Sequence, residues 1–226
     1  MCNKACIDFG LTNINAGDVQ GKTVIEVGSY DVNGSLRSII SKLNPLSYLG
    51  VDILEGPGVD EICTVSELVT RYGKNRFDVV INTEMMEHVQ DWRSAISNLK
   101  NILKPGGVMI LTTRSKGCGY HGYPFDFWRY EVDDMAAIFS DLSIELIEED
   151  PSSPGVFVKA RKPMTFSEKT LEELKLYSIV LDKRCSVVSE LDISLFKTKR
   201  LIRKNFIRPV KTRIRRMFGK EKLSNI

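Results

Sequence analysis

The chain has 226 residues, 42% of them hydrophobic and 27% charged, and a formal net charge of +3. These proportions are typical of a soluble globular protein and exclude a fibrous or intrinsically disordered one. The length suffices for one α/β domain with an appendage, but not for two such domains. No apolar run approaches the roughly 20 residues that cross a bilayer, and the first residues lack a signal-peptide pattern, so we expect a cytoplasmic protein.

The five cysteines are odd in number and scattered, which indicates free thiols rather than a disulfide framework. Cys2 and Cys6 have no second pair to complete a zinc site, and the chain has only two histidines, His88 and His121. The sequence pattern therefore predicts no metal site.

Charge is distributed unevenly along the chain. Between Lys197 and Lys222 there are 12 Lys or Arg residues and one acid. The remainder has 20 bases and 28 acids, so an acidic body with a net charge near −8 precedes a basic tail with a net charge near +11. The acidic body disfavours nucleic acid as a partner. The tail favours an anionic membrane surface, with peripheral membrane association, or an acidic protein partner.

Short apolar segments alternate with amphipathic ones over residues 21–162. The expected strands are 23–27, 47–51, 59–63, 77–81 and 108–112, and the expected helices are 36–43, 64–72, 92–103 and 131–139. Residues 144–147 and 156–160 are expected to form a hairpin that closes the sheet. Alternating strands and helices indicate parallel βαβ units. The predicted fold class is a doubly wound α/β domain with a mainly parallel, seven-stranded sheet.

Three further segments flank this domain. Residues 1–20 are weakly patterned and are expected to form an N-terminal lead-in. Residues 163–196 carry apolar residues near heptad spacing, which predicts a helix that packs on the domain or pairs with a second copy in a homodimer. Residues 197–226 form the basic amphipathic tail, in which Pro209 interrupts the helical pattern. The alternative for this tail is a solvated segment without a partner.

Polar residues end several of the expected strands, at the edge where a parallel sheet binds its ligands. Glu26 and Gly28 end the first strand, Asp52 ends the second and Glu84 ends the fourth. A glycine at this turn lets the backbone approach a ligand closely. The sequence Lys-Pro-Gly-Gly at 104–107 stops the helix that precedes the fifth strand.

This ordered set resembles the class I S-adenosylmethionine-dependent methyltransferases over residues 21–162. In particular, the sequence Glu84-Met85-Met86-Glu87-His88-Val89 resembles the end of the fourth strand in the small-molecule, methyltransferase type 11-like group. The resemblance implies a Rossmann-like methyltransferase fold, S-adenosyl-L-methionine as the cofactor and a methyltransferase activity.

The resemblance also implies roles for individual residues. Asp52 would accept hydrogen bonds from the ribose hydroxyls of the cofactor, and Cys63 and Thr64 would lie against its adenine. Tyr30 stands where the family has a second glycine, and this departure supports a rival hypothesis, a catalytically inactive binding or scaffold protein that acts through its helical basic tail. The implied cofactor-binding residues are Glu26, Gly28, Ser29, Tyr30, Asp52, Ile53, Cys63, Thr64 and Glu84.

We expect methyl transfer to a small molecule or a glycan, preferentially at oxygen. For a hydroxyl acceptor, the protein must align the reactants and supply a base. The candidate bases are His88, His121 and Asp126, of which the last two lie in a glycine- and aromatic-rich loop, 114–130. This loop would cover the acceptor, since aromatic rings suit stacking on sugars. The alternatives are that the loop only plugs the end of the sheet and that His88 only braces the next helix.

Overall fold

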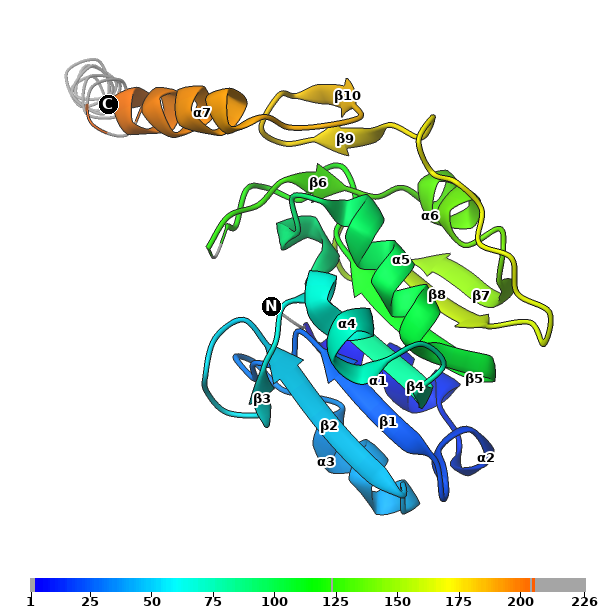
Figure 1. Ribbon diagram of the computed structural model, residues 1–226. Coiled ribbons are helices and arrows are strands. Elements are labelled where there is room, and N and C mark those ends of the chain that lie inside the picture. The colour runs from blue at the N-terminus through cyan, green and yellow to red at the C-terminus, as the bar shows by residue number, and fades with distance from the viewer. Residues whose placement is uncertain (1–2, 123, 204, 206–226) are drawn as a thin grey trace, which may run out of the picture. The chain divides into compact units, whose positions relative to one another are not determined.

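A computed structural model describes residues 3–122, 124–203 and 205 of the chain. Its main sheet has the strand order β3-β2-β1-β4-β5-β8-β7 (Figure 1). Strands β1 to β5 run parallel to one another, and β8 is antiparallel to both β5 and β7. The strands are β1 Thr23–Val27, β2 Ser47–Asp52, β3 Glu61–Ile62, β4 Phe77–Thr83, β5 Leu103–Thr113, β7 Ser143–Glu149 and β8 Val156–Arg161. The predicted fold class is confirmed.

The strand order reverses at β1, which pairs with β2 on one side and with β4 on the other. All five residues of β1 are buried, as expected for a strand that is covered on both faces. In open α/β sheets, ligands bind beyond the carboxyl ends of the strands at such a reversal. The fold therefore places the ends of β1, β2 and β4 at the expected ligand-binding edge.

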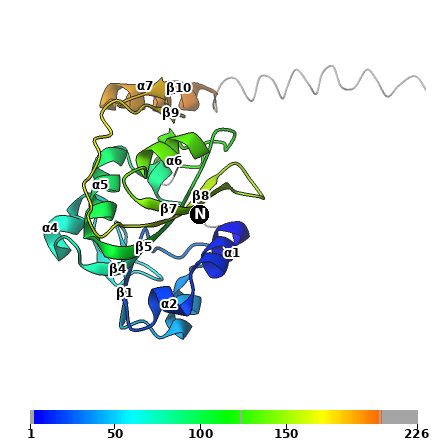
Figure 2. The ribbon, with the colours of Figure 1, turned by 90° about the vertical axis from the view of Figure 1, so that its right-hand side faces the viewer.

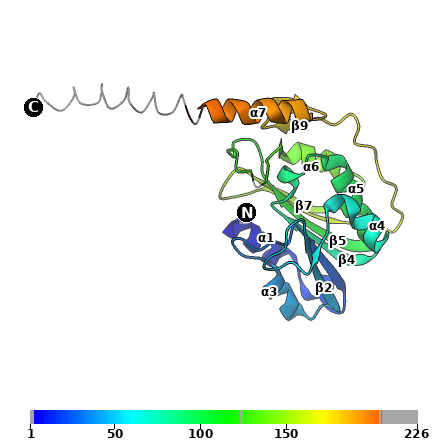
Figure 3. The same ribbon diagram turned by 60° about the vertical axis from the view of Figure 1, so that its left-hand side comes forward.

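Helices cover both faces of the main sheet. Figures 2 and 3 show α1 and α3 on one face and α4 and α5 on the other. Short 3-10 turns extend or precede three of the helices, at Ser41–Leu43, Val65–Glu67 and Met86–His88. The helices are α1 Lys4–Asn13, α2 Ala16–Val19, α3 Arg37–Ile40, α4 Leu68–Tyr72, α5 Trp92–Ile102, α6 Val132–Ile138 and α7 Glu190–Ile202.

The N-terminal lead-in contributes to the hydrophobic core. Cys6 and Phe9 of α1 are buried in one cluster with Leu36 and Ile40. The ring of Phe9 lies 5.0 Å from that of Phe157 on β8. Helix α1 therefore packs on the sheet as an integral layer.

The predicted helix over 163–196 is wrong for most of its length. Strands β9 Leu176–Ser178 and β10 Lys183–Cys185 form there, in a three-stranded antiparallel sheet with β6 Trp128–Arg129. The side chain of Arg93 on α5 donates to the carbonyl oxygens of Leu171, Leu174 and Ser186 at 2.9, 2.5 and 2.6 Å. These long-range bonds hold the segment on the domain and override its helical spacing.

The C-terminal boundary also differs from the prediction. The chain divides into two compact units between Val187 and Val188, not at residue 162. Ser189 caps α7 by accepting a hydrogen bond from the backbone N–H of Asp192, so the helix begins at Glu190, near the end of the predicted 163–196 helix. The pairing helix on which the homodimer prediction relied is therefore not present over 167–189.

Among the described residues, no helix combines the length and the apolar character that a bilayer crossing needs. Most of the predicted basic tail, residues 206–226, lies outside the described residues.

Candidate functional site

A cavity of about 880 Å³ opens at the carboxyl ends of β1, β2 and β4. This volume is in the upper part of the range of small-molecule sites, about 300–1,000 Å³. Nine of the twelve residues that the sequence predicts for the site line the cavity, and the other three do not. The nine are Gly28, Tyr30, Asp52, Ile53, Cys63, Thr64, Glu84, His88 and His121.

Gly28 forms the turn that leaves β1. Its φ of +82° is a conformation that side chains disfavour. A Cβ atom here would lie 2.8 Å from Cβ of Met85, too close for an unshifted structure. The backbone N–H groups of Gly28 and Ser29 both donate to the carbonyl oxygen of Val51, at 2.9 and 3.1 Å. This turn therefore requires glycine, and it is tied to the end of β2.

Asp52 lies on the opposite side of this turn, with a half-buried side chain. Its Oδ2 accepts a hydrogen bond from the backbone N–H of Tyr30 at 3.1 Å, and its Oδ1 accepts one from Leu54 at 3.2 Å. A carboxylate oxygen can accept more than one hydrogen bond, so Asp52 keeps acceptor capacity toward the cavity. The backbone holds this carboxylate in place for a ligand with hydroxyl groups.

Tyr30 occupies the position where the family resemblance leads one to expect a second glycine. Its ring packs on Gly56, where an added Cβ would approach the ring to 2.0 Å. The tyrosine is 37% exposed and lines the cavity. The chain accommodates the bulky side chain by placing a glycine opposite it.

Glu84 lies at the end of β4 with a φ of +55°, which is strained for a residue other than glycine. Its buried carboxylate accepts hydrogen bonds from Thr112 Oγ1 at 3.0 Å and from Arg114 Nε. The thiol of Cys6 donates to the same carboxylate at 3.3 Å. Backbone strain that is held by several side chains is common at functional sites.

Glu26 and Ser29 lie behind the cavity wall. Glu26 is 2% exposed and accepts hydrogen bonds from Tyr48 at 2.8 Å and from Ser35. Burial raises the pKa of Glu26 to about 7, although the bonds from Tyr48 and Ser35 oppose this rise. Ser29 is buried, and its hydroxyl faces Gly50 on β2. Their positions favour support of the Gly28 turn over direct contact with a ligand in the cavity.

Asp126 is fully buried and forms a two-pronged ion pair with Arg129, at 2.6 and 2.7 Å. Its Oδ2 also lies 3.2 Å from Nδ1 of His121. Burial alone would raise the pKa of Asp126, but the bonds from Arg129 and His121 outweigh it and lower that pKa well below its usual range. Because Asp126 is ionised, paired and outside the cavity wall, it does not suit the predicted role of a proton acceptor.

His121 lies between two carboxylates. Its hydrogen bonds to Asp126, Cys118 and Glu87 raise its pKa to about 12, against the effect of burial. The imidazole is therefore protonated at neutral pH, which removes it as a general base in this state. His121 lines the cavity, but the neighbouring charges change what the imidazole can do.

His88 lines the cavity and Glu87 lies buried behind it, both on the 3-10 turn after β4. Nδ1 of His88 lies 2.6 Å from the carbonyl oxygen of Phe125, and its Nε2 lies 3.7 Å from Oε1 of Glu87. Burial raises the pKa of Glu87, but the neighbouring imidazoles of His121 and His88 lower it overall. Glu87 and Asp126 lie on two sides of His121, whereas His88 contacts only Glu87 of these two carboxylates. Among the three candidate bases, His88 is therefore the histidine that is not enclosed by carboxylates.

Two charged residues that support the site from behind the cavity wall, Glu87 and Arg114, were not among the predicted ones. Glu87 is fully buried beside both histidines, and Arg114 is 5% exposed and pairs with Glu84. Their partners lie 26 or more residues away along the chain, apart from His88. The only sequence signal was the adjacency of Glu87 and His88, which is also common in surface turns.

The family of this chain follows from its sequence. A family model described as a methyltransferase domain matches residues 5–150, more than half of the chain. The chain belongs to this methyltransferase-domain family.

Curated relatives match over shorter stretches. The chain is 33% identical over 69 residues to a ubiquinone biosynthesis O-methyltransferase of Parvibaculum lavamentivorans, covering 30% of the chain and 27% of that protein. It is 27% identical over 124 residues to the protein of the same name from Rhizobium etli, covering 49% of the chain and 48% of the relative. The chain thus spans about half or less of the length of these relatives.

Solved structures share the fold. One is the 1,6-didemethyltoxoflavin-N1-methyltransferase of Burkholderia thailandensis with bound 1,6-didemethyltoxoflavin and S-adenosylhomocysteine, with a TM-score of 0.56 and 15% identity over 71% of this chain and 80% of that one. Another is an S-adenosylmethionine-dependent methyltransferase of Mesorhizobium loti, with a TM-score of 0.56 and 16% identity over 71% of this chain and 99% of that one. The Rossmann-like methyltransferase fold is confirmed.

The raised pKa of Glu26 predicts a dependence of stability on pH. The folded state binds this proton more tightly than the unfolded chain, whose pKa is near 4.5, so the stabilisation is full below pH 4.5 and is lost as the pH rises to about 7. At about 1.4 kcal/mol for each pKa unit, the loss is on the order of 3 kcal/mol. Glu26→Gln should remove it, so denaturant unfolding should show the variant gaining stability relative to the wild type from pH 4.5 to 7.

The matched control is Glu55→Gln, at an exposed glutamate. Its stability curve should run parallel to that of the wild type over the same range. A parallel curve for Glu26→Gln as well would contradict the buried, proton-binding state of Glu26.

Proposed function

We propose that this protein is an S-adenosylmethionine-dependent methyltransferase that methylates a small molecule at oxygen. The observation that carries the proposal is the placement of Gly28, Asp52 and Glu84 around one large cavity, in a chain of the methyltransferase-domain family. The names of the curated relatives support oxygen as the methylated atom.

The cavity residues fit the cofactor. Gly28 forms a tight turn against Met85 where a Cβ would not fit, and such a turn lets the backbone approach the methionine part of the cofactor. Asp52 would accept hydrogen bonds from both ribose hydroxyls, as acids at the end of a second strand do in dinucleotide sites. Ile53, Cys63 and Thr64 line the adjoining wall and would contact the adenine. The cofactor supplies a methyl group already activated by its sulfonium, so the chain's task is alignment.

The acceptor would bind at the other end of the cavity. His88, His121, Pro124, Phe125 and Phe127 line that wall. Aromatic side chains suit stacking on a flat ring or on a sugar, so an aromatic alcohol is the first candidate acceptor and a glycan is the second. The lining supports the prediction that loop 114–130 covers the acceptor.

Of the candidate bases, His88 is the one that would take the proton from a hydroxyl acceptor. Asp126 is buried in its ion pair, and His121 is already protonated. Methyl transfer to a hydroxyl requires mainly that the two reactants are aligned and that a proton acceptor lies nearby.

The cofactor site predicts a specific loss of affinity. Asp52→Ala removes the acceptor for two hydroxyl groups, and hydrogen bonds to a charged group contribute about 1.5–3 kcal/mol, so affinity for S-adenosylhomocysteine should fall by about 10- to 100-fold. Isothermal titration measures this, with Glu55→Gln as the control that keeps wild-type affinity. If the folded wild type does not bind, the cofactor proposal is wrong and the scaffold hypothesis is favoured.

The acceptor side predicts a loss of turnover without a loss of cofactor affinity. With radiolabelled S-adenosylmethionine and catechol as the probe acceptor, His88→Gln should lower kcat by about 10²-fold or more. The dissociation constant for S-adenosylhomocysteine should stay within twofold or so of the wild-type value, by the additivity of separate sites. Wild-type turnover in this variant would rule out a role for His88 in the reaction.

We further propose that α7 brings the protein to an anionic membrane surface. Leu191, Leu195 and Ile202 are exposed at helical spacing on one face, and Lys197 and Arg200 lie on others. A chain that ends at residue 189 should float less with vesicles that contain phosphatidylserine than the full chain does, and salt should weaken the flotation of the full chain. Equal flotation of the two chains would contradict this proposal.

A further inference from the structure

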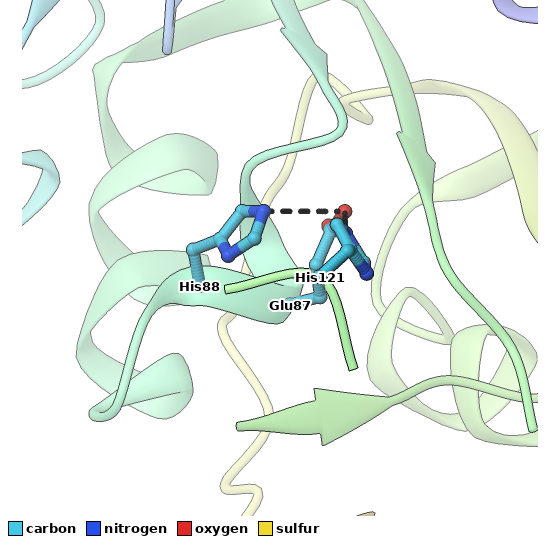
Figure 4. A group of neighbouring side chains, drawn as sticks. All are labelled: Glu87, His88 and His121. Carbon is cyan, nitrogen blue, oxygen red and sulfur yellow. Dashed lines mark ion pairs between the residues drawn. The ribbon is translucent and has the colours of Figure 1, made fainter. Parts of the chain in front are cut away.

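Three potential ligand atoms converge beside the cavity. Nε2 of His121 lies 3.4 Å from Oε1 of Glu87, and Nε2 of His88 lies 3.7 Å from the same oxygen (Figure 4). The ligand atoms of the three residues all lie within 4.8 Å of one another. Glu87 and His88 come from the 3-10 turn after β4, and His121 comes from loop 114–130. Two elements far apart in the sequence thus meet at one carboxylate oxygen.

In both histidines, the second ring nitrogen, Nδ1, faces oxygen atoms that accept hydrogen bonds. Nδ1 of His88 lies 2.6 Å from the carbonyl oxygen of Phe125. Nδ1 of His121 lies 3.1 Å from the carbonyl oxygen of Gly119 and 3.2 Å from Oδ2 of Asp126. Since these oxygens accept hydrogen bonds, both Nδ1 atoms carry hydrogen, and each Nε2 is the atom left for a ligand. On His121, a metal ion would displace the proton from Nε2. Metal-binding histidines are oriented in this way by an outer carbonyl or carboxylate.

Glu87 supplies the third atom. Its side chain is fully buried, and its Oε2 accepts a hydrogen bond from Thr113 at 2.9 Å. Its Oε1 has no hydrogen bond of good geometry and faces the two imidazoles. A buried carboxylate oxygen in this state is costly unless a cation shares it.

We propose that Oε1 of Glu87 and Nε2 of His88 and His121 bind a divalent transition-metal ion. Two histidines and one carboxylate, with one position left open, form a ligand set that zinc and iron use in catalytic sites. Zinc bonds of about 2.0–2.2 Å in tetrahedral geometry separate ligand atoms by roughly 3.4 Å. The observed separations of 3.4 and 3.7 Å match this value, and the two imidazoles need only approach each other.

The ion would face the acceptor end of the cavity, because His88 and His121 both line it. This part of the inference rests on the proposed function. A bound divalent ion lowers the pKa of a hydroxyl that it contacts. With the ion bound, His88 would be a ligand and not the base, so the hydroxyl would lose its proton to water. Its oxygen would form the bond to the methyl carbon, and the bond between that carbon and the sulfonium sulfur would break. The one open position suits a single hydroxyl oxygen of the acceptor.

The spacing of these residues explains why the sequence predicts no metal site. His88 and His121 are 33 residues apart, in a chain with no other histidine. Short motifs with two ligands on one helix or one knuckle, by which metal sites are found in sequences, are absent from this arrangement.

The test is direct titration of the metal-free full chain with Co²⁺ and Zn²⁺, with neither cofactor nor acceptor present. We expect one ion per chain and a cobalt absorption spectrum of nitrogen and oxygen ligands. Loss of a group that hydrogen-bonds to a metal ligand typically weakens metal binding by about 10- to 100-fold. Loss of a ligand itself should weaken it by at least as much, so we expect this effect from each of Glu87→Gln, His88→Gln and His121→Gln. Cys118→Ser is the matched control, since this thiol lies 3.8 Å from Nδ1 of His121 and should not matter.

Two results would overturn the metal site. One is the absence of saturable binding to the wild type, and the other is binding that the three variants leave unchanged or that Cys118→Ser abolishes. Titration with S-adenosylhomocysteine checks that each variant is folded, and the variant at the most exposed of the three side chains, His121→Gln, remains informative if Glu87→Gln does not fold. Because metal and cofactor are titrated separately, a failed metal site and a failed cofactor site give different results.

Discussion

The buried guanidinium of Arg114 holds the ligand-binding edge of the sheet together. It pairs with Glu84 at the end of β4 and, at 3.0 Å, with Asp150 beyond β7. Helix α1 joins the same group, because Cys6 contacts Glu84 and Asn3 donates to Asp150 at 2.8 Å. Removing one partner from a buried ion pair costs about 3–5 kcal/mol. The strained Glu84 and the cavity beside it therefore depend on contacts from three separate segments of the chain.

A second buried network lies on the acceptor side of the cavity, and it decides which groups are free for chemistry. Arg129 neutralises Asp126, and Asp126 in turn orients His121 toward Glu87. The charges of Asp126 and Arg129 thus fix the position of the loop. The groups that remain beside the cavity are the two imidazoles, next to the buried carboxylate of Glu87. Such an arrangement suits cation binding and precise alignment better than general-base catalysis by Asp126.

Most of the fold was predictable because strand and helix periodicity are local properties. The ends of β1, β2 and β4 follow from short apolar runs, and these runs place Gly28, Asp52 and Glu84 at one edge by topology alone. Protonation and pairing were not predictable, because Asp126 looks like a free acid until Arg129 and His121 enclose it. The segment 163–189 was misassigned because long-range bonds from α5 overrode its heptad-like spacing.

The central claim is that the cavity between the Gly28 turn and Asp52 holds the methyl donor. A crystal structure of the full chain with S-adenosylhomocysteine tests it most directly. The account predicts the ribose hydroxyls on the carboxylate of Asp52, the adenine against Cys63 and Thr64, and the sulfur facing His88. A ligand bound elsewhere, or one whose adenine occupies the wall of His88 and His121, would contradict it.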